Sequence, residues 1–102
     1  MDSNSYLSRV DVVLNRAADW LEGFDPDEVD FSTSDGVVTI EFPDGTKYVL
    51  NRQRAAEQVW FAAGAEAWHY NFDPESGEWR DAKDGHELFA NIEDRVNKKL
   101  KS

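Results

Sequence analysis

Carboxylate side chains at helical spacing are the residues of this chain best suited to chemistry. Asp11, Asn15, Asp19 and Glu22 lie four, four and three positions apart, so in a helix they would share one face. Asp19 and Glu22 would stand near the C-terminal end of that helix, where the helix dipole disfavours negative charge. Carboxylates without a His or Cys ligand bind hard cations with little selectivity, and exposed ones bind them weakly. The pattern therefore indicates a weak cation site.

Negative charge is distributed unevenly along the 102 residues. The formal net charge is −10, yet residues 1–44 contain eleven acidic residues and only two basic ones, whereas residues 45–102 contain ten and nine. A field of this sign repels nucleic-acid backbones and attracts cations or basic protein surfaces. A generally solvating acidic coat is the alternative interpretation, although such a coat would be spread more evenly along the chain.

Stricter catalytic and metal motifs are absent from the sequence. The spacing Asp25-x-Asp27-x-x-Asp30 begins like a calcium-binding loop, but Asp30 stands where that loop requires glycine. His69 and His86 are not at helical ligand spacing, so we assign both of them structural roles. No nucleophile and base form a recognisable set, and no glycine-rich phosphate loop is present. We therefore predict that the protein is not an enzyme.

The composition describes one folded domain over residues 1–102. Hydrophobic residues make up 40% of the chain and aromatic residues 13%, which is enough to bury a core. The absence of cysteine excludes disulfides and thiolate metal ligands, and it fits a cytoplasmic protein. The first residues lack the basic and apolar regions of a signal peptide, and no apolar run approaches the roughly 18 residues that a membrane helix needs.

Hydrophobic periodicity predicts two helices on either side of a series of short strands. Apolar residues at three-to-four spacing define helices over Ser5–Gly23 and His86–Leu100. Alternating β-branched and aromatic residues define strands over Val29–Thr33, Val37–Phe42, Thr46–Asn51, Gln58–Ala62, Ala67–Phe72 and Glu78–Arg80. Short links favour an antiparallel meander, and two amphipathic helices bury their apolar faces best on one side of it. The predicted fold is an α+β two-layer sandwich.

Trp60 has two possible positions in this fold. Its neighbours Val59 and Phe61 must lie on the opposite sheet face from Trp60, because side chains alternate along a strand. If the neighbours point toward the helices, Trp60 faces solvent beside Asn51 and Gln53, and such a residue favours protein docking. If they do not, Trp60 is an ordinary core residue. The spacing alone leaves both positions open.

Two motifs five residues apart, Asn51-Arg52-Gln53 and Gln58-Val59-Trp60, are the most distinctive part of the sequence. They follow Asp44-Gly45-Thr46 and precede Trp68-His69-Tyr70, Gly77-Glu78-Trp79 and Asp84-Gly85. With these motifs the chain resembles the frataxin family, in particular its bacterial CyaY type, over about residues 5–100. The resemblance implies two terminal helices packed on one face of an antiparallel sheet, in agreement with the periodicity.

The resemblance also implies a metal site. Frataxins bind ferrous or ferric iron weakly and exchangeably on an acidic ridge formed by the first helix and the first strand. The corresponding acids of this chain are Asp11, Asp19, Glu22, Asp25, Asp27, Glu28 and Asp30.

The same resemblance implies partners. Frataxins associate with the cysteine desulfurase and the scaffold protein of iron–sulfur cluster assembly, and the family's tryptophan at the position of Trp60 contacts a partner. We expect Asn51, Gln53, Gln58 and Trp60 to contact the scaffold. The expected function is an iron-binding adaptor that regulates cluster assembly, monomeric unless iron drives oligomerisation. A ferroxidase and a metal-independent acidic protein-binding module are the alternatives.

Overall fold

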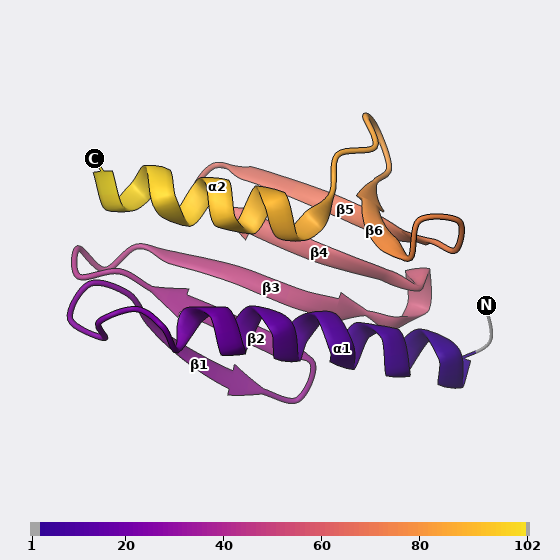
Figure 1. The fold of residues 1–102 in the computed structure, drawn as a ribbon, viewed down its shortest axis with the longest axis horizontal. Coiled ribbons are helices and arrows are strands. Elements are labelled where there is room, and N and C mark those ends of the chain that lie inside the picture. The colour runs from indigo at the N-terminus through magenta and orange to yellow at the C-terminus, as the bar shows by residue number, and fades with distance from the viewer. Residues whose placement is uncertain (1–2, 102) are drawn as a thin grey trace.

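The structure is a computed structural model that describes residues 3–101. Its elements are α1 (Ser3–Leu21), β1 (Asp30–Ser34), β2 (Val37–Glu41), β3 (Lys47–Gln53), a short 3-10 helix (Arg54–Ala56), β4 (Gln58–Ala63), β5 (Glu66–Asp73), β6 (Glu78–Asp81) and α2 (Leu88–Lys101). The six strands form one antiparallel sheet in the order β1-β2-β3-β4-β5-β6, so each strand pairs with its neighbour in the sequence. Both helices lie on the same face of this sheet (Figure 1). The predicted two-layer α+β sandwich is confirmed.

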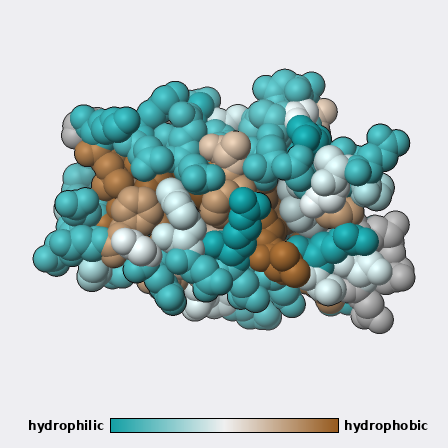
Figure 2. All heavy atoms as spheres, in the orientation of Figure 1, coloured by the Kyte–Doolittle hydropathy of each residue, from teal (hydrophilic) through white to brown (hydrophobic). Residues whose placement is uncertain are grey.

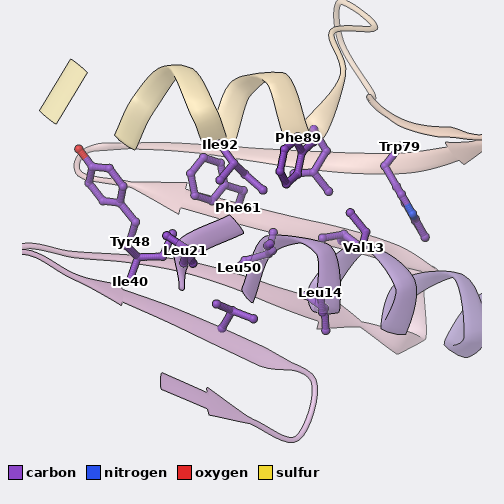
Figure 3. Close-up of a cluster of buried hydrophobic side chains, with 14 of the residues drawn as sticks. Val13, Leu14, Leu21, Ile40, Tyr48, Leu50, Phe61, Trp79, Phe89 and Ile92 are labelled. Atoms are coloured by element: carbon purple, nitrogen blue, oxygen red, sulfur yellow. The ribbon is translucent and has the colours of Figure 1, made fainter. Parts of the chain in front are cut away.

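The core lies between the helices and the sheet. Figure 3 shows Val13, Leu14 and Leu21 of α1 in one cluster with the sheet residues Leu50 and Phe61. Apolar positions of both helices at three-to-four spacing are buried, as the periodicity predicts. Tyr6, which is fully buried, donates a hydrogen bond from its hydroxyl to the backbone oxygen of Gln58, at 2.6 Å. This bond fastens the beginning of α1 to β4.

The surface of the helix layer is mostly polar. Figure 2 shows charged and polar side chains over both helices, with apolar residues visible in the band between them. The half-buried side chains of Leu7, Trp20, Phe24 and Leu100 pack against the core from its margin. Val12 on α1 is the large apolar side chain that stands out, since 68% of its surface is exposed.

The predicted boundaries differ from the observed ones by at most two residues, and α2 shows why. The sequence places the start of this helix at His86, whereas it begins at Leu88. Glu87 caps the helix instead, because its carboxylate oxygens accept hydrogen bonds from the backbone N–H groups of Phe89 (2.6 Å) and Ala90 (3.0 Å). His86 is held in the preceding loop, where its backbone N–H donates a hydrogen bond to Asp84 Oδ1.

Candidate functional site

One face of α1 and the first hairpin form a groove lined by carboxylates. Asp11, Asp19 and Glu22 line it from the helix side, and all three are exposed. Thr33 and Ser34 of β1 line it from the sheet side, and the groove encloses about 410 Å³. The predicted helical spacing therefore places these three acids in one concave surface against the strands.

The other predicted acids occupy the connection from α1 to β1. Asp25 accepts a hydrogen bond from the backbone N–H of Asp27 (2.9 Å), which makes this segment a tight turn. Asp27 and Glu28 line a second hollow, together with Asp44 and Lys99. Asp30 begins β1 and accepts a hydrogen bond from the N–H of its neighbour Phe31. We call the acidic edge the seven residues Asp11, Asp19, Glu22, Asp25, Asp27, Glu28 and Asp30.

None of the seven residues of the acidic edge forms an ion pair with a described Lys, Arg or His side chain. The two bases of α1 face elsewhere. The guanidinium of Arg9 lies 4.2 Å from the ring centre of Phe72, and that of Arg16 lies 3.8 Å from the ring centre of Phe89. These cation–π contacts direct both positive charges toward β5 and α2. The helix α1 therefore has an acidic side toward β1 and β2 and a basic side toward the rest of the molecule.

The carboxylates of the acidic edge are close but do not converge on one point. Within the described residues, no three of them bring ligand atoms within 4.8 Å of one another. An ion bound here would keep most of its water, because few protein oxygens can reach it at once. The geometry fits weak and exchangeable binding of hydrated cations.

Next to the acidic edge, Asp44 has a dedicated partner. Its Oδ2 lies 2.5 Å from the Lys99 ammonium, so the β2–β3 hairpin is joined to the end of α2. The hydrogen bond from Lys99 holds the pKa of the Asp44 carboxyl well below its ordinary value, and the backbone N–H of Thr46 contributes as well. The same bond raises the pKa of Lys99. Asp44 therefore stabilises the fold through an ion pair, whereas the neighbouring residues of the acidic edge have no described basic partner.

The predicted partner-binding residues lie together on the outer face of the sheet. Asn51 pairs with Trp60 across β3 and β4, and Gln53 pairs with Gln58. Val59 and Phe61 are fully buried under the helices, so Trp60 projects from the opposite face, where it is half-buried. The indole N–H of Trp60 donates to Gln58 Oε1 at 2.9 Å, and Gln53 donates to Asn51 at 2.8 Å. The outward position of Trp60 is the one that the structure adopts.

Two residues of β5 extend this surface. The His69 ring stacks on Trp60 with a centroid distance of 4.2 Å and an angle of 12° between the planes. Asn71 accepts a hydrogen bond from Gln58 Nε2 at 3.1 Å. Sequence reasoning missed both, although the alternation of aromatic and polar residues in β5 placed them on the outer face. We call the amide face the six residues Asn51, Gln53, Gln58, Trp60, His69 and Asn71.

A family model described as a frataxin-like domain matches residues 1–102. This chain belongs to the frataxin family. Among its frataxin-like relatives are proteins named iron-sulfur cluster assembly protein CyaY. The one from Paraburkholderia phymatum is 37% identical over 90 residues, which cover 88% of this chain and 83% of the relative. The one from Burkholderia mallei is 37% identical over 93 residues, with the same coverage.

Solved frataxin structures have the same fold. The frataxin of Psychromonas ingrahamii superposes with a TM-score of 0.88 at 25% identity, covering all of this chain and 94% of the other. The trimeric frataxin of the yeast Saccharomyces cerevisiae, solved in complex with ferrous iron, superposes with a TM-score of 0.78 at 29% identity. That match covers 92% of this frataxin-like chain and 87% of the yeast chain. In the part of the chain described here, neither helix is long and apolar enough to cross a membrane.

Proposed function

We propose that this frataxin-like protein is an iron-binding adaptor that regulates iron–sulfur cluster assembly. The observation that carries the proposal is the unpaired state of the acidic edge. Seven carboxylates gather where no described Lys or Arg side chain neutralises them, although the chain has eleven basic residues to offer. The resulting field attracts cations and a basic protein surface alike.

The acidic edge would hold ferrous or ferric iron weakly. Carboxylates are suitable ligands for such ions, and the exposed groove lined by Asp11, Asp19 and Glu22 leaves room for a hydrated one. Salt would weaken the binding, since exposed charges are screened beyond about 8 Å at physiological ionic strength. A site of this kind suits delivery or sensing of iron better than storage.

The acidic edge and the amide face would each bind a different partner. A basic patch of the cysteine desulfurase would meet the acidic edge, so that iron and the desulfurase compete for the same carboxylates. The scaffold protein would meet the amide face, where Trp60 supplies a flat aromatic anchor and the amides of Asn51, Gln53 and Gln58 supply hydrogen bonds. The yeast relative is named as a trimer, which supports the formation of oligomers by this otherwise monomeric chain, and we expect iron to promote them.

Charge reversal tests the acidic edge. The variant in which Asp19, Glu22, Asp25 and Asp27 are all replaced by Lys should lose both iron binding and association with the desulfurase. Calorimetry with ferrous iron under anaerobic conditions and a pull-down with purified desulfurase would measure the two. The control reverses four acids that lie outside the edge, at Glu57, Glu75, Glu93 and Asp94, with the same change in net charge. If the edge variant and the control behave alike, the proposal is wrong.

Truncation of the aromatic anchor tests the amide face. Trp60→Ala should abolish binding to the scaffold protein while the affinity for iron stays unchanged, because Trp60 lies on the sheet face away from the helices. An oxygen-uptake assay with ferrous iron then separates an adaptor from a ferroxidase. Desulfurase binding of equal strength with and without iron would favour the metal-independent acidic module instead.

A further inference from the structure

A second group of metal-ligating side chains lies at the end of β6 and in the loop that leads to α2. Asp81, Asp84 and His86 each place one ligand atom so that all three atoms lie within 4.8 Å of one another. Among residues 3–101 this is the one group of three or more His, Cys, Asp or Glu side chains with such geometry. Figure 1 shows this loop beyond β6, at the other end of the sheet from the connection between α1 and β1. The group is therefore separate from the acidic edge.

The burial of Asp81 distinguishes this group from an exposed acidic cluster. Only 8% of Asp81 is exposed, and it is the one charged residue in the buried part of the described structure. Its Oδ2 accepts hydrogen bonds from the backbone N–H groups of Lys83 (2.8 Å) and Asp84 (3.1 Å). Its carboxylate also lies beside that of Asp84, and no described Lys or Arg side chain forms an ion pair with it. A buried carboxylate beside a second carboxylate is costly unless a positive charge compensates for it.

His86 is held in position from its far side. Its Nε2 lies 2.7 Å from the hydroxyl of Tyr70, and that hydroxyl also accepts a hydrogen bond from Asn91 Nδ2 at 2.8 Å. Because Tyr70 is fully buried, the ring of His86 cannot turn freely. The other ring nitrogen, Nδ1, faces Asp84 Oδ1 at 2.5 Å. Protein metal sites commonly have this arrangement, in which one ring nitrogen binds the ion and the other donates to a fixed oxygen.

We propose that Asp81, Asp84 and His86 form a binding site for a divalent transition-metal ion. The ion would enter between His86 Nδ1 and Asp84 Oδ1, which lie 2.5 Å apart and must separate to admit it, and Asp81 would supply a third ligand. The proton of the neutral ring then resides on Nε2, which donates to Tyr70. Water completes the coordination. The imidazole nitrogen selects Zn²⁺, Co²⁺, Ni²⁺ or Fe²⁺ over Mg²⁺ and Ca²⁺, which sets this site apart from an all-carboxylate surface.

The site does not depend on the function proposed for the acidic edge, and the test keeps the two apart. The probe is Co²⁺, a paramagnetic ion, added to the ¹⁵N-labelled full chain and followed by NMR. Backbone amides of residues 81–86 should broaden first, together with the indole N–H of Trp68, whose ring lies 6.2 Å from that of His86. A second titration with Mg²⁺ should leave these signals in place.

His86→Gln should weaken Co²⁺ binding at this loop by about 10- to 100-fold, a range known from changes around metal ligands. His69→Gln is the control for the loss of a histidine. The His69 ring stacks on Trp60, while its backbone oxygen, which the substitution keeps, accepts a hydrogen bond from the N–H of Ala82. This variant should bind Co²⁺ as the parent chain does. Asp84→Asn is the second variant, because it removes an exposed ligand and leaves the buried Tyr70 contact intact. The Asp19→Asn, Glu22→Gln variant should change only the signals of the acidic edge. Unchanged broadening of residues 81–86 in both His86→Gln and Asp84→Asn, or broadening confined to residues 11–30 in the parent chain, would overturn the proposal.

Discussion

Two sets of carboxylates on this molecule have opposite surroundings. The seven residues of the acidic edge have no described Lys, Arg or His partner. Eight other acids each lie within 4.0 Å of a basic nitrogen: Asp35, Glu41, Asp44, Glu66, Asp73, Glu78, Asp84 and Asp94. Three of the eight belong to the first 44 residues, so position in the sequence does not separate the sets. The sets are separated by proximity to the basic residues of β3, β6, α2 and the loop before α2.

The difference shows which carboxylates serve the fold. Arg80 contacts Glu78 at 2.6 Å and Asp73 at 3.6 Å, and it donates to the backbone oxygen of Gly85 at 2.9 Å. One side chain thereby holds three segments around the edge of the sheet. No comparable contact involves the acidic edge, where Asp19 and Glu22 also oppose the dipole of α1. Asp19 and Glu22 therefore carry negative charge that no described basic side chain of the protein compensates.

Neutralising the groove is expected to have the largest effect. The variant Asp11→Asn, Asp19→Asn, Glu22→Gln should lower the affinity for ferrous iron about tenfold or more, because each lost charge removes on the order of 1 kcal/mol of attraction for a nearby cation. Calorimetry at low ionic strength would measure it. The variant Glu66→Gln, Glu78→Gln removes paired acids and should bind iron as the parent chain does. Equal losses of iron affinity in the two variants would show that the acidic edge and the paired acids do not differ in iron binding.

Removing a structural base should have the next largest effect. Arg80→Ala is expected to lower the free energy of unfolding by about 1–2 kcal/mol, since it removes contacts to two carboxylates and one carbonyl. Urea unfolding would measure the change. Arg54→Ala is the control, because Arg54 is exposed and forms no ion pair with an acid of residues 3–101, and the variant should stay within about 0.5 kcal/mol of the parent chain.

The pairing of Asp44 predicts a dependence of stability on acid pH. Lys99 lowers the pKa of Asp44 in the folded chain below the ordinary value of 3.8, so the pair stabilises the fold above that pH. The stabilisation is lost as the pH falls toward the folded-state pKa. Asp44→Asn should therefore lower the melting temperature at pH 7 and flatten its decline between pH 5 and pH 2. Parallel melting curves for the variant and the parent chain across that range would contradict the assignment.

The smallest expected effect has the opposite sign. Asp19→Asn and Glu22→Gln should each raise the free energy of unfolding, by about 0.3–1 kcal/mol, because they remove negative charge near the C-terminal end of α1. Thermal unfolding at low ionic strength would detect the gain, and added salt should reduce it. A loss of stability would show that these carboxylates serve the fold after all.

The sequence was sufficient for the fold and for part of the division of residues between surfaces. Helical spacing placed Asp11, Asp19 and Glu22 on one side of α1. Period-2 alternation placed Val59 and Phe61 on the sheet face opposite Trp60, but only the structure shows that their face is the buried one. Periodicity cannot show which carboxylates meet a base, because ion pairs such as Asp44 with Lys99 join residues 55 positions apart.

The cluster of Asp81, Asp84 and His86 was missed for a different reason. These residues are five positions apart at most, but Asp84 and His86 lie in the loop after β6, where no repeat predicts the direction of a side chain. The spacing Asp-x-x-Asp-x-His was visible in the sequence, but His86 was assigned to the start of the helix, apart from the two aspartates before it. Glu87, which caps α2, is the residue that separates the loop from the helix.

The meander has a consequence for how the chain folds. Every strand pairs with its neighbour in the sequence, so the sheet can assemble from successive hairpins with little loss of loop entropy. The helices are attached to the sheet by contacts between residues far apart in the sequence. An example is the hydrogen bond from Tyr6 to Gln58, which are 52 positions apart. We therefore expect the hairpins to form early and α1 to dock late. Substitutions in β3 and β4 should slow refolding, whereas substitutions at the start of α1 should chiefly speed unfolding.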